Sequence, residues 1–220
     1  MQARKQRQQT LSDVRRALVL EAARCVFLEA GIEGANIRAI ARRAGYTPGA
    51  IYSYFDSKEA IYGALLAQSL ERLNATVDLA PVLKNRPDKT LQAKSMAWFS
   101  FYAENPRDLD LGFYLVQGLK PRGLTAELNS QLNDRLRDAL RPHELALLAM
   151  GLSQANAARE SAALFAHGVG LLLLQHTGRI RLFGQNATVL FDIYLEQLLM
   201  RCKGNAAEGN MTMAATVAPP

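Results

Sequence analysis

Residues 36–62, which read NIRAIARRAGYTPGAIYSYFDSKEAIY, constrain this chain most, because they hold two helix starts around one glycine. Asn36 is suited to cap a first helix, since its side-chain oxygen can accept a free N–H of the opening turn. Gly45 stands where that helix must end, because glycine adopts positive φ at little cost. Thr47 then provides an N-cap, and Pro48 a first helical residue whose missing N–H is not needed. The stretch predicts two short helices joined by a tight turn.

The side chains of this stretch separate into an inner and an outer set. In the second helix, Pro48 to about Phe55, Ile51 and Phe55 are predicted to face inward at positions i and i+4. A helix of two turns is not stable alone, so its outer face is expected to lie against another surface. The first helix has an apolar stripe of Ile37, Ile40, Ala41 and Ala44 and an opposite side with Arg38, Arg42 and Arg43. The outer residues of the second helix are Thr47, Gly49, Tyr52, Ser53 and Tyr54.

Positive charge is concentrated around this stretch. The whole chain carries a net charge of +6. Residues 1–60 hold ten Lys and Arg against six Asp and Glu, a balance of +4, which leaves +2 for residues 61–220. A local basic excess of this kind suits contact with phosphate. Two helices joined by a short turn with glycine form a helix-turn-helix, whose second helix enters the major groove of DNA.

The string I-R-x-I-A-R-R-A-G-Y-T-x-G-x-I-Y-x-Y-F-x-S-K-E resembles the DNA-binding signature of the TetR family of transcriptional regulators. The resemblance covers about residues 14–62, and the remaining chain resembles the family in length and helical organisation. Tyr46 departs from the pattern, because the family more often has a smaller aliphatic residue there. The resemblance implies a DNA-binding regulator, in most members a repressor, whose second domain binds a small molecule that changes the spacing of the DNA-binding heads. The matching residues are Ile37, Ile40, Ala41, Ala44, Gly45, Thr47, Gly49, Ile51, Tyr52, Tyr54, Phe55, Lys58 and Glu59.

We expect the DNA contacts to come from both helices and from the start of the next one. Tyr52 and Tyr54 suit phosphates through their hydroxyl groups, and the small residues between and before them suit close approach to base edges. Ile37 and Arg38 can place N–H groups and a cation at a phosphate. The resemblance implies that Lys58 contacts a DNA phosphate. The alternative is an ordinary lysine that faces solvent. The predicted contact residues are Ile37, Arg38, Thr47, Pro48, Gly49, Ala50, Tyr52, Ser53, Tyr54 and Lys58.

The whole chain is predicted to be all-α, with about nine helices and no strand alternation. Residues 1–12 are predicted to form a flexible basic arm, which can follow phosphates or remain a solvated tail. Residues 13–57 form a three-helix DNA-binding domain with the helix-turn-helix. Residues 58–203 form a helical domain for effector binding and dimerisation, and residues 204–220 a disordered tail.

Helical periodicity continues on both sides of the motif. The preceding helix, from about residue 12 to Ala30, is predicted to bury one stripe of apolar side chains. The following helix is predicted to begin near Ser57 and to end near Leu79. Pro142 is expected to break a later helix, since it lacks an N–H and clashes with the preceding turn. The predicted buried stripe of the first helix is Val14, Leu18, Ala22, Val26 and Phe27.

Two late segments, residues 162–174 and 189–199, are apolar on much of their circumference. A helix that is apolar on most sides is buried on most sides. We therefore predict a homodimer packed through these last two helices as a four-helix bundle, which the resemblance also implies. A single buried central helix in a monomer is the alternative. A two-fold dimer places its recognition helices about 34–36 Å apart and reads a palindromic operator in double-stranded DNA.

Several aromatic and polar residues of the second half have the types expected in a pocket for a small, largely apolar effector. Aromatic residues at helical spacing also pack as ordinary core, so both interpretations stand. The candidate pocket residues are Trp98, Phe101, Tyr102, Phe113, Tyr114, Gln117 and His167.

No catalytic or metal-binding pattern is visible in the sequence, so no enzyme, metal site or cofactor is predicted. The three histidines, His143, His167 and His176, lie on separate segments without metal-ligand spacing. The alternatives are an all-helical enzyme or small-molecule-binding protein and an adaptor that uses the helix-turn-helix for protein contacts. The charge bias argues against an adaptor, and salt-dependent binding would separate it from a DNA-binding protein.

The predicted location is a reducing cytoplasm. Cys25 and Cys202 are expected to be free thiols, and the N-terminus lacks the apolar core of a signal peptide. The longest apolar stretch, residues 162–174, is interrupted by a histidine and two glycines, so no membrane span is predicted.

Overall fold

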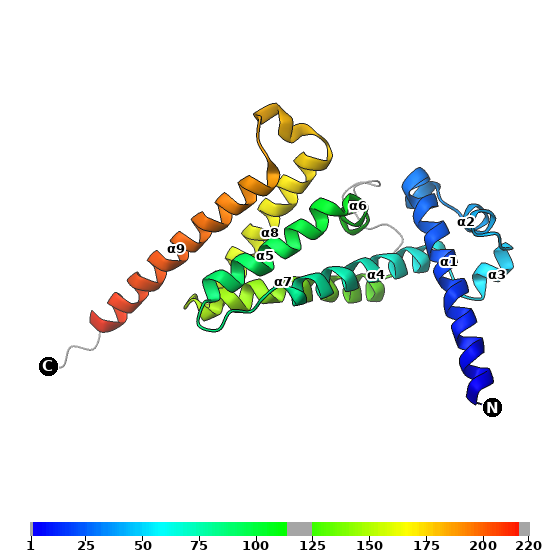
Figure 1. The fold of residues 1–220 in the computed structure, drawn as a ribbon, viewed down its shortest axis with the longest axis horizontal. Coiled ribbons are helices and arrows are strands. Elements are labelled where there is room, and N and C mark those ends of the chain that lie inside the picture. The colour runs from blue at the N-terminus through cyan, green and yellow to red at the C-terminus, as the bar shows by residue number, and fades with distance from the viewer. Residues whose placement is uncertain (1, 114–124, 216–220) are drawn as a thin grey trace. The chain divides into compact units, whose positions relative to one another are not determined.

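The computed structural model describes residues 2–113 and 125–215, with the side chains of most of them (Figure 1). Within these ranges every regular element is a helix, which confirms the predicted all-α class. The described chain divides into two compact units. The first unit comprises Met1–Glu71 and Arg107–Asp134, and the second comprises Arg72–Pro106 and Arg135–Pro220. This division passes through α4, whereas the sequence places a domain boundary before Lys58, and that boundary stays a prediction.

Helix α1 spans Gln2–Gly34 and contains a break at Gly31, where φ is 67°. The sequence predicts a flexible basic arm over residues 1–12, but the described part of this segment is helical. The difference has a local cause, because Gln, Arg and Lys are good helix formers and need no tertiary partner to favour a helix. The side-chain amide of Gln9 also donates to Asp13 at 3.0 Å, one helical turn away. The expected contact of this arm with phosphate stays a prediction.

The core of the first unit is built where α1 meets the short helices α2 (Ile37–Ala44) and α3 (Pro48–Tyr52) and the first half of α4 (Lys58–Leu79). The rings of Phe27 and Tyr62 pack edge to face with centroids 5.7 Å apart. The Tyr62 hydroxyl donates to the carbonyl of Leu111 in α6 (Pro106–Phe113). The buried apolar residues include Val19, Leu20, Ala23, Val26, Phe27, Ile40, Ile51, Phe55, Ile61, Leu65 and Leu109.

One prediction for α1 is partly wrong. Ala22, Val26 and Phe27 are buried as predicted, but Val14 and Leu18 are exposed. The buried stripe instead begins at Val19 and Leu20. Periodicity identifies an apolar stripe, whereas the point along the helix at which packing starts depends on the helices that face it.

The second unit contains the rest of α4, α5 (Pro87–Glu104), most of α7 (Ala126–Ala149), α8 (Gln154–His176), a 3₁₀ turn η1 (Arg179–Phe183) and α9 (Ala187–Ala215). Helices α8 and α9 contact each other and α5 (Figure 1). Aromatic rings fill the contact, since Phe99 stacks on Phe191 with centroids 4.3 Å apart and the Trp98 ring lies 5.5 Å from that of Phe165 in α8. Helix α9 extends beyond residue 204, where the sequence predicts a disordered tail.

Pro142 lies inside α7 and does not end it, so the predicted break is wrong. An interior proline removes one backbone hydrogen bond and costs about 3 kcal/mol. Buried residues on both sides of it, Ala139, Ala146 and Leu147, hold the two halves of the helix in the core. Tertiary packing therefore outweighs the local preference for a break.

Helix α8 is the one described helix that is long and apolar enough to cross a membrane by length and composition. Its most apolar window has a mean hydropathy of 1.2, and only 28% of that window is buried inside the chain. Isolated glycines and a histidine do not prevent a helix from being apolar on average, and the absence of a membrane span stays a prediction. A single helix of this kind is weak support for a membrane span, since an interface helix passes the same test. The measurement does show that much of α8 is left uncovered within the chain.

At Gly168, α8 lies directly against the aromatic core. A Cβ atom at this position would lie 2.5 Å from Cζ3 of Trp98 and 3.1 Å from Cε2 of Phe191. We expect Gly168→Ala to lower the free energy of unfolding by about 1–3 kcal/mol, as overpacking does in a filled core. The matched control is Gly170→Ala in the same helix, where a Cβ meets nothing within 4 Å. Urea unfolding should separate the two variants, and equal stabilities would contradict this account.

Candidate nucleic-acid interface

The first helix of the motif, α2, is closed at both ends by the predicted residues. The side-chain oxygen of Asn36 accepts from the Ala39 N–H at 2.9 Å. Gly45 adopts the left-handed conformation, with φ 72° and ψ 28°. The next N–H, that of Tyr46, returns to the carbonyl of Ala41 at 2.9 Å, so the last turn is satisfied by backbone alone. These caps confirm the predicted bounds of α2 and set the direction in which the chain enters α3.

The second helix of the motif, α3, is anchored from inside. Thr47 caps it, with its hydroxyl accepting from the Ala50 N–H at 3.2 Å, and Pro48 follows at the first helical position. Ile51 is fully buried and Phe55 nearly so, which confirms the predicted inner face. The helix ends at Tyr52 rather than near Phe55, although the Phe55 N–H still donates to the Ile51 carbonyl at 3.1 Å.

The outer face of α3 is open. Thr47, Pro48, Gly49 and Ser53 are exposed, and Tyr52 is 55% exposed. Ala50 and Tyr54, which complete the set predicted on and beside this helix, are half-buried. A Cβ atom at Gly49 would meet only the Thr47 hydroxyl, at 4.0 Å, so no described part of the chain requires glycine there. A bare backbone at this point suits the close approach of an outside surface.

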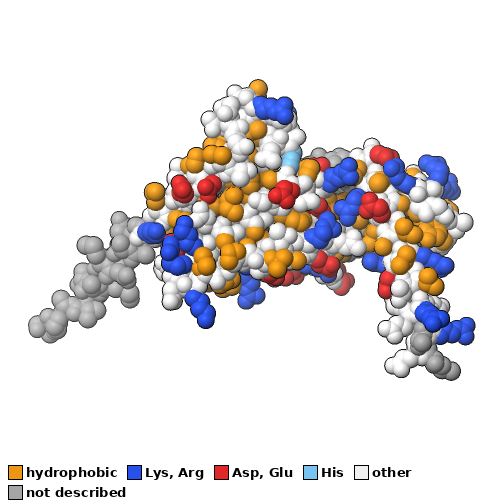
Figure 2. All heavy atoms as spheres, in the orientation of Figure 1, with side chains coloured by type: hydrophobic (Ala, Val, Ile, Leu, Met, Phe, Trp, Pro, Cys, Tyr) orange, Lys and Arg blue, Asp and Glu red, His pale blue; other side chains and the backbone are white. Residues whose placement is uncertain are grey.

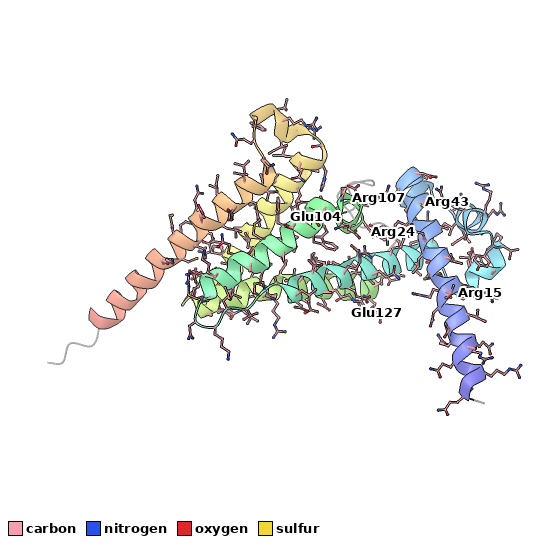
Figure 3. The ribbon with its side chains drawn as sticks, in the orientation of Figure 1. Arg15, Arg24, Arg43, Glu104, Arg107 and Glu127 are labelled. Atoms are coloured by element: carbon pink, nitrogen blue, oxygen red, sulfur yellow. The ribbon has the colours of Figure 1, made fainter. Side chains whose placement is uncertain are left out.

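Some arginines of this unit contact a carboxylate or an aromatic ring, and others have no such contact among the described residues (Figure 3). Arg43 pairs with Glu29 at 2.6 Å, which raises its pKa above the ordinary value, and Arg24 lies 3.9 Å from Asp108. The guanidinium of Arg16 lies over the Phe55 ring, 4.8 Å from its centroid. Arg15, Arg38 and Arg42 are exposed and form no ion pair or side-chain hydrogen bond with the described residues. Figure 2 shows Lys and Arg side chains on α1 and beside α2.

Three of the predicted contact residues lie on the neighbouring helices α2 and α4. Arg38 is exposed and Ile37 is half-buried at the start of α2. Lys58 turns partly toward the protein, since its ammonium donates to the Ala35 carbonyl at 3.2 Å. Its contact with phosphate therefore stays a prediction. Arg42 is not among the predicted contact residues. It is exposed one helical turn after Arg38, and the i+4 spacing that places the two arginines on one side of α2 is visible in the sequence.

The predicted effector residues are only partly brought together. Trp98, Phe101 and Tyr102 are buried neighbours on α5, with the rings of the last two 5.3 Å apart. His167 lies on α8 and stacks on Tyr194 at 4.1 Å, and its partial burial lowers its pKa. Tyr114 and Gln117 lie outside the described residues, as does the side chain of Phe113. The described ranges contain no cluster of three His, Cys, Asp or Glu that could hold a metal ion.

The fold and this open helix define an all-helical protein of the helix-turn-helix class. Residues 19–65 match the family described as "Bacterial regulatory proteins, tetR family". The HTH-type transcriptional regulator UidR of Escherichia coli strain K12 is 39% identical over 64 residues, 29% of this chain and 33% of that protein. The HTH-type transcriptional repressor KstR of Mycolicibacterium smegmatis is 32% identical over 77 residues, 35% of this chain and 38% of that protein. The matches thus span about a third of the length of these relatives.

The likeness in fold extends further than the likeness in sequence. A bacterial regulatory protein in the tetR family from Rhodococcus RHA1 has a TM-score of 0.64 at 19% identity, covering 84% of this chain and 95% of that one. The sequence likeness to the tetR family therefore lies in residues 19–65, and the remaining chain is similar to that solved structure in fold.

Proposed function

We propose that this protein is a sequence-specific DNA-binding transcriptional regulator that acts as a homodimeric repressor. The observation that carries the proposal is the exposed face of α3, where Thr47, Gly49 and Tyr52 are presented by a helix fixed from inside. A helix of this kind can lie in the major groove, with hydroxyl groups at phosphates and small residues at base edges. The names of the relatives, regulator and repressor, support the same function.

The direct test is selection of bound sequences from random duplex DNA, followed by titration of the selected duplex at increasing salt. We expect a palindromic site and a steep fall in affinity with salt, because each neutralised phosphate releases counterions. A protein that shows no preference among duplexes at low ionic strength would contradict the proposal. An adaptor would show neither the preference nor the slope.

The exposed apolar faces of α8 and α9 support the proposed homodimer. Most of the apolar window of α8 is uncovered within the chain, and large hydrophobic side chains are exposed on both helices. Burial of apolar surface is the main favourable term in association, at about 25 cal/mol per Å². The exposed residues are Leu173, Val189, Ile193 and Met200. A second copy that presents the same two helices would cover them as a four-helix bundle.

Ile193→Lys tests this surface. Because Ile193 is exposed within the chain, we expect the variant to fold but to weaken dimerisation at least about 100-fold, since a lysine would be buried without a partner. Sedimentation equilibrium measures the effect. Leu79→Lys, at an exposed position at the end of α4, is the matched control and should leave the dimer intact. Equal dimerisation of the two variants would place the interface elsewhere.

A small effector that releases DNA is the further part of the proposal. Two polar atoms in the predicted pocket set, Nε1 of Trp98 and Nε2 of His167, are buried without a hydrogen-bond partner among the described residues, and a ligand could satisfy them. The burial of Trp98, Phe101 and Tyr102 is equally that of ordinary core. Calorimetric screening of apolar and aromatic compounds, with operator release as the second readout, tests control by a ligand. A panel without effect on DNA affinity would count against it.

A further inference from the structure

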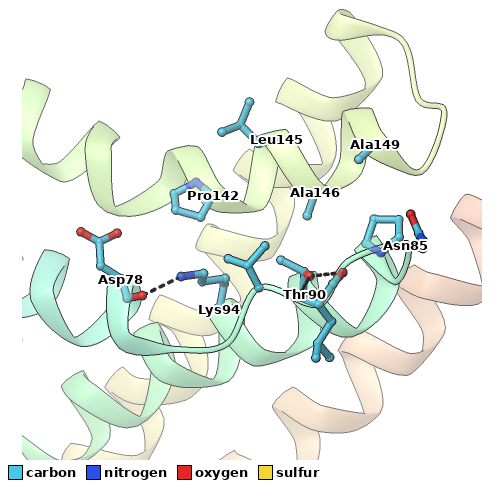
Figure 4. A pocket seen from close by; sticks show the side chains of 11 residues that line it. Asp78, Asn85, Thr90, Lys94, Pro142, Leu145, Ala146 and Ala149 are labelled. Carbon is cyan, nitrogen blue, oxygen red and sulfur yellow. Dashed lines mark hydrogen bonds between the residues drawn. The ribbon is translucent and has the colours of Figure 1, made fainter.

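A cavity of about 560 Å³ lies in the second unit, and none of its lining residues belongs to the predicted aromatic pocket (Figure 4). Its walls come from the last turn of α4, the loop of residues 80–86, the first turns of α5 and the C-terminal half of α7. Most of the lining is apolar, with a few polar groups, as in sites for small organic ligands. The lining residues are Asp78, Val82, Leu83, Asn85, Pro87, Thr90, Lys94, Pro142, Leu145, Ala146 and Ala149.

Lys94 is the polar centre of this cavity. The residue is only 4% exposed, and its ammonium donates to the carbonyls of Val77 at 2.7 Å and Asp78 at 3.1 Å (Figure 4). These carbonyls belong to the C-terminal end of α4, whose partial negative charge favours a cation. An ammonium has three N–H donors, so one remains. No carboxylate pairs with Lys94 among the residues that the structure describes, and a buried charge without a counter-ion is costly.

The apolar walls are held in place before any ligand arrives. The Leu83 N–H donates to the Thr90 hydroxyl at 2.9 Å, and the Arg86 N–H donates to the Leu83 carbonyl at 3.1 Å, so the loop is tied to α5. Three of the lining side chains, Val82, Leu83 and Leu145, are nevertheless exposed to solvent. A ligand with an apolar body would cover them and remove apolar surface from water.

We propose that this cavity binds a monocarboxylate with an apolar body, whose carboxylate accepts the free N–H of Lys94. The carboxylate supplies the counter-ion that the buried ammonium lacks, and the apolar body covers the exposed wall. A single free donor, together with the Asp78 side chain at the cavity, favours a monoanion over a multiply charged phosphate. The other titratable neighbour, His143, is buried and neutral near pH 7, so it adds no charge. This inference goes beyond DNA binding and does not rest on it.

Calorimetric titration of the purified full chain, without DNA, tests the inference with three probes of equal chain length. These are decanoate, decanol and decyltrimethylammonium, each used below its micelle-forming concentration. We expect decanoate to bind at least about tenfold more tightly than decanol, as a charge-assisted hydrogen bond predicts, and the cation not to bind. If decanol bound as tightly as decanoate, or if the cation bound more tightly than decanoate, the proposal would be overturned without any substitution in the protein.

Two substitutions locate the site. Lys94→Met keeps the length of the side chain and removes its charge, so it should weaken decanoate at least about tenfold and leave decanol unchanged. Because Lys94 also caps α4, Ala149→Trp serves as a second variant that obstructs the cavity from an exposed position. Its matched control is Ala155→Trp, at an exposed position of α8 that does not line the cavity. Decanoate affinity unchanged in Ala149→Trp, or in a folded Lys94→Met, would show that the ligand binds elsewhere.

Discussion

Replacing Tyr52 by alanine is expected to weaken binding of the selected duplex by about 10²- to 10⁴-fold. A hydrogen bond to a charged group contributes about 1.5–3 kcal/mol, and a two-fold dimer loses it twice, which gives about 3–6 kcal/mol. Each 1.4 kcal/mol corresponds to a tenfold change in affinity. Fluorescence anisotropy of the labelled duplex at fixed salt measures the loss directly.

The exposure of Tyr52 makes this a test of DNA contact rather than of folding. Its side chain is 55% exposed, so its removal is expected to change the free energy of unfolding by no more than about 0.5 kcal/mol. Tyr52→Phe is the matched variant, because it keeps the ring and removes only the hydroxyl donor. It should retain a large part of the affinity if the ring also packs on the backbone, and should equal Tyr52→Ala if the hydroxyl alone matters. If Tyr52→Ala bound the selected duplex as tightly as the natural chain, Tyr52 and the outer face of α3 would not be part of the DNA interface.

Acidification below pH 6.5 is expected to destabilise the second unit through His143 of α7. Its side chain is buried, and burial is the main cause that lowers its pKa from 6.5 to about 4. The Leu140 carbonyl lies 3.1 Å from Nδ1 and only accepts, so Nδ1 carries a hydrogen. Nε2 is buried without a hydrogen-bond partner among the described residues, which suits the bare nitrogen of a neutral ring.

The sign of the effect follows from proton binding. Between pH 6.5 and about 4 the unfolded chain binds a proton at His143 that the folded chain does not bind, so acid favours unfolding. The stabilising contribution is complete above pH 6.5 and is lost as pH falls to about 4. At 1.36 kcal/mol for each unit of pKa, the total loss is roughly 3 kcal/mol.

The measurement is urea unfolding as a function of pH, compared between the natural chain and His143→Gln. Carboxylates also titrate in this range, but they do so equally in both proteins. The difference between the two curves therefore isolates His143. We expect the natural chain to lose roughly 3 kcal/mol more than the variant on acidification from pH 7 to pH 4. Parallel curves would show that His143 is not held neutral by burial.

Local backbone chemistry explains why the helix caps and the inner face of α3 could be predicted from the sequence. Asn36, Gly45 and Thr47 act on N–H groups and dihedral angles within a few residues of themselves, so their roles need no knowledge of the fold. The inner face of α3 followed from the i, i+4 spacing of Ile51 and Phe55. Lys58 is different, because its contact with the Ala35 carbonyl joins positions far apart along the chain.

The amino-acid order was sufficient for the helices, the caps and the orientation of the recognition helix, because each of these depends on neighbours within one or two turns. Contacts between segments far apart in the sequence decided where helices continue, where their buried stripes begin and where a cavity forms. Packing on both sides of Pro142 kept α7 continuous against the local preference of proline, and the facing helices moved the buried stripe of α1 away from Val14 and Leu18. The cavity around Lys94 needed the end of α4, the loop after it and α7 to meet, and no periodicity within one segment encodes such a meeting.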